Sequence, residues 1–108
     1  MQRGNIFANI PDLLPTEVME TLINSGNVRI ERIVSSGQST PEGEWYDQRQ
    51  DEWVLLLSGS AGLMLESEAE VRMLKAGDYV MIPAHCRHRV AWTNSHEITI
   101  WLAVHVER

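Results

Sequence analysis

The sequence predicts an all-β fold that is preceded by one short helix. From Val28 onward, short segments either place apolar residues at every second position or are almost continuously apolar. Turn-forming Gly, Pro, Ser and Asn residues separate these segments. Many short strands divided by such turns are typical of a double-stranded β-sandwich or a jelly-roll barrel. At 108 residues, the chain is long enough for one domain with one core.

The N-terminal part favours a helix. Residues 17–23 carry apolar side chains at positions 18, 19, 22 and 23, which is helical spacing. Thr16 precedes them as a candidate N-cap, and Gly26 follows as a candidate left-handed residue after the helix end. We therefore expect residues 1–27 to form a lead-in and a short helix that packs on the barrel, and residues 28–108 to form the barrel itself.

Two of the predicted strands are apolar on both faces. One is residues 53–57. The other is residues 98–104, which lie within a predicted closing strand at 97–106. The other predicted strands lie at 28–35, 61–66, 71–74, 79–82 and 89–92. A sandwich has a single interior, so the second apolar face needs a cover. We expect the N-terminal segment to cover part of it and a second subunit to cover the rest, which predicts a homodimer.

Composition and charge exclude several classes of function. Nine basic against fifteen acidic residues give a net charge of −6, which argues against a nucleic-acid partner. No apolar run approaches the roughly 20 residues of a membrane span, so we expect no membrane partner. The N-terminus lacks the apolar region of a signal peptide. Cys86 is the only cysteine, which makes the reducing cytoplasm the expected compartment.

The segment from Gly77 to Trp92 combines a strand, a proline, a polar corner with two histidines, and a returning strand. Gly77 is followed by five residues, then Pro83-Ala84-His85, then two residues and His88. This spacing resembles the second motif of the cupin family. One position departs from the family pattern, because His85 stands where cupins usually have a glycine.

A second segment resembles the first cupin motif. Glu52 and Gly59 are separated by six residues, as in that motif. The family's His-x-His is missing, and Tyr46-Asp47-Gln48 takes its place three residues before Glu52. The resemblance covers roughly residues 28 to 106. It implies a cupin-type jelly-roll barrel, and it also points to a homodimer, because small single-domain cupins are commonly dimers.

The resemblance implies a metal cage at four positions of this chain: Tyr46, Gln48, Glu52 and His88. Strand parity agrees, because Tyr46 and Gln48 share the parity of Glu52 while Asp47 points away. A four-residue register would instead use Trp45 and Asp47, and a β-bulge would allow it.

We take Gln48, Glu52 and His88 as candidate metal ligands, with Tyr46, His85 and Trp92 as candidate pocket residues. Such a mixed nitrogen and oxygen set suits a divalent Zn, Mn, Fe or Ni ion.

A purely structural role is the alternative for these residues. Glu52 would then be held by Arg87 or Arg89, and His88 would be a hydrogen-bonded interior histidine. We expect Cys86 to be a packed thiol rather than a nucleophile. We also expect His105 at the surface or an interface, and Trp53 and Trp101 on the outer sheet face or at a dimer seam.

The sequence leaves two functions open. One is a metal-dependent cupin enzyme that acts on a small polar molecule, with an unassigned reaction and unidentified catalytic residues. The other is a non-catalytic binding or structural module without metal. The fold alone does not decide between them, because one fold supports many activities.

Overall fold

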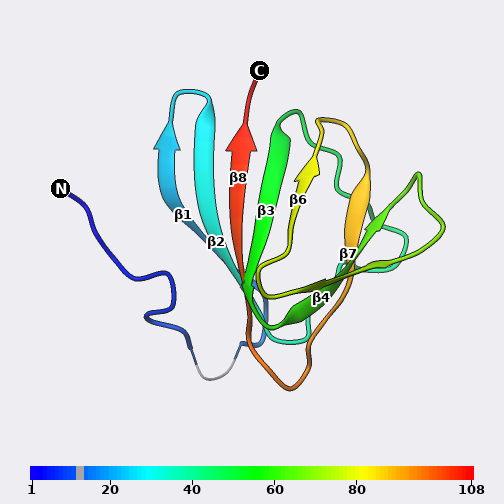
Figure 1. Ribbon diagram of the computed structural model, residues 1–108, viewed down its shortest axis with the longest axis horizontal. Coiled ribbons are helices and arrows are strands. Elements are labelled where there is room, and N and C mark those ends of the chain that lie inside the picture. Colours follow the sequence, from blue (N-terminus) through cyan, green and yellow to red (C-terminus); the bar gives the residue numbers. More distant parts are fainter. Residues whose placement is uncertain (12–13) are drawn as a thin grey trace.

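The computed structural model describes residues 1–11 and 14–108, and these residues form two packed antiparallel sheets (Figure 1). The larger sheet has the strand order β1-β2-β8-β3-β6, and the smaller sheet has the order β5-β4-β7. The strands are β1 (Val18–Ser25), β2 (Val28–Ser35), β3 (Asp51–Ser58), β4 (Ser60–Leu65), β5 (Arg72–Lys75), β6 (Tyr79–Ile82), β7 (His88–Thr93) and β8 (Thr99–Val106). The predicted all-β sandwich is therefore confirmed, apart from its helix.

The core lies between the two sheets. Strand β3 contributes Val54 and Leu56, β4 contributes Leu63, β6 contributes Ile82 and β8 contributes Trp101. All five side chains are buried. Burying a side chain of this size stabilises a protein by about 1.5–3 kcal/mol relative to leaving it in water. The core therefore fixes how the sheets face each other.

The predicted helix over residues 17–23 is wrong, because the described residues contain no helix and this segment belongs to β1. Gly26 does have a positive φ of 57°, but it starts the two-residue turn of the β1–β2 hairpin instead of following a helix. A register shift between Thr21 and Ile23 moves the apolar side chains from one sheet face to the other. Met19 pairs with Ile33 before that bulge, whereas Ile23 follows it. A bulged strand can therefore imitate helical spacing.

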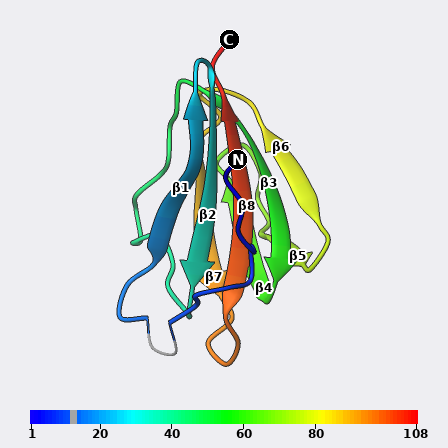
Figure 2. The same cartoon turned by 90° about the vertical axis from the view of Figure 1, so that its left-hand side faces the viewer.

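The N-terminal segment crosses the outer face of the larger sheet (Figure 2). Its anchor is Arg32 of β2, which is only 5% exposed. The Arg32 guanidinium donates hydrogen bonds to the carbonyls of Ile6 and Ala8, over 3.1 Å and 2.6 Å, and pairs with the carboxylate of Glu20. The segment therefore covers part of this face.

The rest of the outer face is apolar and half-exposed. Its side chains alternate with inward-facing ones on β2, β3 and β8, and they include Val28, Ile30, Trp53, Leu55, Leu102, Val104 and Val106. We call these seven residues the outer apolar face. Within residues 1–11 and 14–108, no helix is long and apolar enough to cross a membrane.

Candidate functional site

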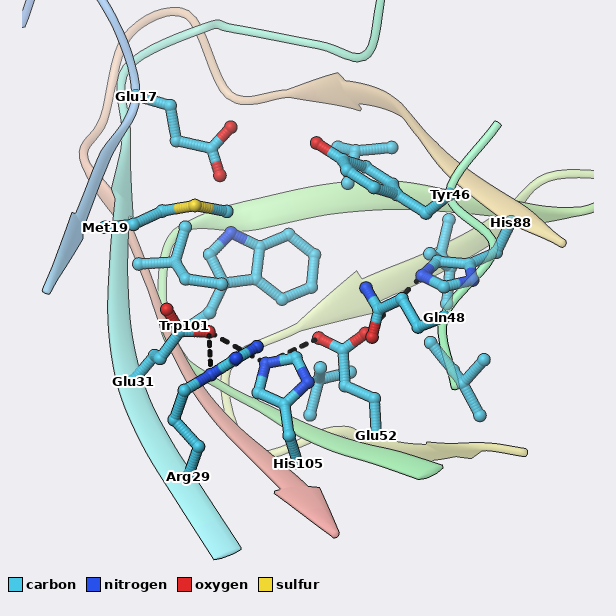
Figure 3. Close-up of a pocket in the computed structure, with 15 residues that line it drawn as sticks. Glu17, Met19, Arg29, Glu31, Tyr46, Gln48, Glu52, His88, Trp101 and His105 are labelled. Carbon is cyan, nitrogen blue, oxygen red and sulfur yellow. Dashed lines mark ion pairs between the residues drawn. The ribbon is translucent and has the colours of Figure 1, made fainter. Parts of the chain in front are cut away.

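A cavity of about 180 Å³ lies between the two sheets (Figure 3). This volume corresponds to roughly six water molecules at their liquid density. Apolar side chains of the core line part of it, and the rest of the lining is polar or aromatic. The polar and aromatic residues are Glu17, Arg29, Glu31, Tyr46, Gln48, Glu52, His88, Trp101 and His105. A cavity with such a mixture is the kind of place where small ligands bind.

Glu52 and His88 face each other in this cavity. Glu52 is the second residue of β3 and His88 is the first residue of β7, and both are buried. The Nε2 atom of His88 lies 3.5 Å from Oε1 of Glu52. The His88 Nδ1 atom lies 2.9 Å from the carbonyl oxygen of Cys86. A carbonyl only accepts hydrogen bonds, so Nδ1 carries a proton, and Nε2 of the neutral ring turns its lone pair toward Glu52.

The pKa of His88 is raised above its ordinary value. Burial is the largest influence on it and acts in the lowering direction. The carboxylate of Glu52 and the carbonyl of Cys86 outweigh burial because both favour the protonated ring. The Glu52 carboxylate therefore stabilises a positive charge beside it, such as that of the protonated His88 ring.

The segment that carries Tyr46 and Gln48 is held beside β7 by backbone hydrogen bonds. Tyr46 and His88 form an isolated bridge, and the amide of His85 donates to the carbonyl of Gln48 over 2.7 Å. Both Tyr46 and Gln48 line the cavity, whereas Asp47 points outward and contacts His85. Oε1 of Gln48 is buried and has no hydrogen-bond partner.

His85 and Trp92 are not among the residues that line the cavity. The His85 side chain is 68% exposed, and its Nδ1 atom lies 2.9 Å from a carboxylate oxygen of Asp47. Trp92 would share the parity of His88 on a regular strand. A register shift in the β4–β7 pairing between Gly62 and Leu63 brings Trp92 opposite Gly62, outside the cavity.

The arginines that a purely structural role would require are engaged elsewhere. Arg87 pairs with Glu66 at 2.7 Å, and Arg89 donates a hydrogen bond to the carbonyl of Thr40 over 2.8 Å. Oε1 of Glu52 is buried and has no hydrogen-bond partner. Within the described residues, Glu52 is therefore not held by either arginine.

Several cavity residues were not expected from the sequence, among them His105, Glu31 and Arg29. His105 is only 4% exposed, which corrects the expectation of a surface or interface histidine. Its Nε2 atom lies 2.8 Å from Oε1 of Glu31 and 4.0 Å from Oε2 of Glu52. The Arg29 Nε atom lies 3.5 Å from Oε1 of Glu31. A chain of alternating basic and acidic groups therefore runs from His88 through Glu52, His105 and Glu31 to Arg29.

The alternation of side chains along β2 and β8 could have predicted that these residues share one face of the sheet. Trp101, Ala103 and His105 share one face of β8, and they pair with Ile33, Glu31 and Arg29 on the same face of β2. Trp101 is buried against the cavity, which also corrects its expected place on the outer face. The more apolar face of β2 was the natural candidate for the interior. In the structure, the more polar face of β2, which carries Arg29 and Glu31, lines the cavity instead.

Glu17 and Tyr46 stand opposite each other at one end of the cavity (Figure 3). Burial raises the pKa of the Glu17 carboxyl. Burial also raises the pKa of Tyr46, and the nearby charge of Glu17 adds to that effect. Among the described residues, Glu17 forms no ion pair within 4.0 Å.

The donor set fits a divalent cation only if Gln48 takes part. Among the described residues, no three His, Cys, Asp or Glu side chains are grouped closely enough to hold a metal ion. A third donor would have to be of another kind, and the buried, unpartnered Oε1 of Gln48 is one that lines the cavity. With Oε1 of Glu52 and Nε2 of His88, this gives one nitrogen and two oxygen donors.

The fold and the cavity together define a small jelly-roll barrel with a polar site between its sheets. Sequence comparison then shows that the chain belongs to the cupin domain family, whose model matches residues 32–105. The suspected resemblance to a small single-domain cupin is thereby confirmed. Among proteins with curated functions, none matches the chain.

Solved structures agree with this assignment. A proposed mannose-6-phosphate isomerase from Ralstonia eutropha is 48% identical, has a TM-score of 0.97, and is matched over 100% of both chains. A cupin superfamily protein from Desulfitobacterium hafniense is 20% identical, with a TM-score of 0.79 over 100% of this chain and 94% of that one. An RmlC-like cupin from Methanocaldococcus jannaschii is 22% identical, with a TM-score of 0.71 over 91% and 86% of the two chains. The last two similarities show the fold alone.

Proposed function

We propose that this cupin binds a divalent metal ion through Gln48, Glu52 and His88 and holds a small polar molecule in the same cavity. One observation carries the proposal. Oε1 of Gln48 and Oε1 of Glu52 are buried without hydrogen-bond partners, beside a histidine whose Nε2 lone pair the Cys86 carbonyl orients. Each unsatisfied buried oxygen costs about 1–3 kcal/mol, and a cation would satisfy both.

The charge of the cavity supports a cation as well. Glu17, Glu31 and Glu52 contribute three carboxylates, against the single guanidinium of Arg29. The cavity therefore carries an excess of two negative charges when His88 and His105 are neutral. Burying uncompensated charge is costly, so a divalent cation matches this excess. Zn, Mn, Fe and Ni all accept a mixed nitrogen and oxygen set.

A bound metal would supply Lewis-acid polarisation of a ligand oxygen. The chain's own residues perform the remaining tasks. Cys86 fixes the His88 tautomer, while Glu31 lies 2.8 Å from Nε2 of His105. Tyr46 and Glu17 are the two groups at the cavity mouth that are placed to exchange a proton with a ligand. The reaction stays unassigned, and the cytoplasm is the proposed compartment.

The name of the Ralstonia eutropha protein raises a phosphorylated sugar as a ligand. Phosphate groups are usually bound by several arginines, lysines or backbone amides. The only arginine that lines this cavity, Arg29, is already beside Glu31, and three carboxylates line the same space. The cavity as it stands therefore favours an unphosphorylated ligand, and mannose 6-phosphate becomes a useful probe.

A metal-free binding module is the second candidate function. Its supporting observation is the 2.8 Å contact between His105 and Glu31, because a protonated His105 would offset part of the negative charge within the cavity. In that case the ligand alone would satisfy the oxygens of Gln48 and Glu52.

Metal analysis tests the main proposal. Protein purified without chelator or a metal-affinity column should contain close to one divalent ion per chain by plasma mass spectrometry. Glu52→Gln keeps the shape but removes the charge, so it should lose most of the metal while circular dichroism shows an unchanged fold. Glu66→Gln is the matched control, because Glu66 is exposed and outside the cavity. A folded, metal-replete Glu52→Gln protein would refute the cage, and a metal-free wild type would favour the binding module.

A further inference from the structure

We propose that the mouth of the cavity binds the cationic nitrogen of an organic ligand, an ammonium or quaternary ammonium group, between Glu17, Trp101 and Tyr46. This inference deepens the proposed function, since it rests on the cavity being a ligand site and names the ligand's chemical class. It does not require the metal, because Glu17 lies away from Gln48, Glu52 and His88, although the ring centroid of Tyr46 is 5.6 Å from that of His88.

The first support is the difference between the three carboxylates that line the cavity. Glu31 lies beside Arg29 and His105, and Glu52 lies beside His88. Glu17 has no ion pair among the described residues, although it is partly buried. A desolvated carboxylate without a countercharge favours a cation at its side. Burial raises the pKa of the Glu17 carboxyl, because desolvation disfavours the charged form.

The second support is aromatic. Trp101 is 5% exposed and its indole lies across the cavity below Glu17, while Tyr46 points its hydroxyl end toward Glu17 from the other side (Figure 3). Met19 completes this end of the cavity. Tryptophan and tyrosine faces attract cations, and aromatic cages beside a carboxylate are suited to ammonium groups that carry carbon substituents.

A third observation shows that the cavity as a whole is built for an occupant. Glu52 is more than nine-tenths buried, with 7% exposure, and it lines the cavity with an oxygen that has no hydrogen-bond partner. A ligand with a polar or anionic group toward Gln48, Glu52 and His88, or toward a metal there, and an ammonium group toward Glu17 would use both ends. Amino acids and betaines have this polarity.

Choline and its uncharged isostere 3,3-dimethylbutan-1-ol test the inference, because they differ mainly in the charge at one atom. Isothermal titration calorimetry with the full chain should show choline binding about tenfold or more tightly, the factor expected for a desolvated cation–π contact near a carboxylate. Glu17→Gln should abolish most of that difference. Glu70→Gln is the matched control, since it removes the same charge from an exposed turn.

The outcomes separate this inference from the metal proposal. Equal binding of choline and its isostere, unchanged choline binding by Glu17→Gln, or no binding of choline at all would each overturn the ammonium site. Tighter binding of mannose 6-phosphate than of choline would also overturn it, in favour of a phosphorylated ligand. None of these results bears on metal content, which Glu52→Gln reports separately. Thermal unfolding of each variant shows whether lost binding reflects lost folding, and Trp101→Phe, with its weaker cation–π face, provides a second folded test.

Discussion

The two nitrogens of the His88 ring stand in different environments. Nδ1 donates to the carbonyl of Cys86, and Nε2 faces the carboxylate of Glu52. Glu52 and Cys86 favour the protonated ring strongly enough to raise its pKa despite the opposing effect of burial. The protonation of His88 is therefore linked to the stability of the fold.

The raised pKa predicts a pH-dependent contribution of His88 to stability. Because the folded pKa lies above the unfolded value, this contribution is complete below pH 6.5 and is lost as the pH rises through the folded pKa. The free energy of unfolding of metal-free wild type, relative to His88→Asn, should therefore fall over that range in urea titrations. A difference that stays constant with pH would contradict the assignment.

His85 shows how a single backbone conformation links a motif to its site. Its φ is 62°, in the left-handed region that favours glycine, and the family usually has glycine at this position. The side chain contacts Asp47 and the amide holds Gln48 in place. His85 therefore acts on the segment that carries Gln48, while its imidazole stays outside the cavity.

At the scale of elements, two irregular pairings decide which side chains reach the cavity. Met19, before the bulge in β1, lines the cavity, whereas Ile23, after it, lies on the other face of the sheet, and this change of face imitates a helical pattern. The irregularity in the β4–β7 pairing keeps Trp92 outside. Alternation along a regular strand is readable from sequence, but one inserted residue reverses it, and nothing in the local sequence of residues 18–25 or 88–93 marks the insertion.

Gly59, in the turn between β3 and β4, is required for the close approach of another strand. Its φ is 82°, and a Cβ there would lie 2.7 Å from Cα of Thr99 and 2.8 Å from the carbonyl oxygen of Ile98. Gly59→Ala should therefore lower the free energy of unfolding by about 2–4 kcal/mol, through backbone strain and overpacking. Chemical denaturation measures this change.

Gly43→Ala separates the two causes. Gly43 has a similar φ of 84°, but a Cβ there would meet nothing within 4 Å. This variant should lose only the cost of the left-handed conformation, about 1–2 kcal/mol. Equal losses in the two variants would show that the contact with Thr99 and Ile98 carries no energy of its own.

At the scale of the whole molecule, the larger sheet has polar cavity groups beside core residues on its inner face and mainly apolar groups on its outer one. The cavity contains Arg29, Glu31, Glu52 and His105, while the outer apolar face remains half-exposed beside the N-terminal segment. A patch of this kind on a small protein is typical of an interface. We propose that a second copy of the chain covers it.

Light scattering tests this homodimer. The wild type should show twice the chain mass of 12.3 kDa at micromolar concentration. Val104→Lys places a charge in the outer apolar face and should shift the protein to the monomer, whereas Glu70→Lys, in an exposed turn, should not. A monomeric wild type at that concentration would contradict the proposal.

The sequence by itself determined the family, the all-β architecture, and the presence of Tyr46, Gln48, Glu52 and His88 at positions of one motif pair. These features depend on spacing and on alternation along single strands, which are local properties of the chain. The tertiary structure decided which face of each strand is inside, because that depends on bulges and on the partner strand. It therefore placed β1 in the sheet and brought Glu17, Glu31, Trp101 and His105 into the cavity.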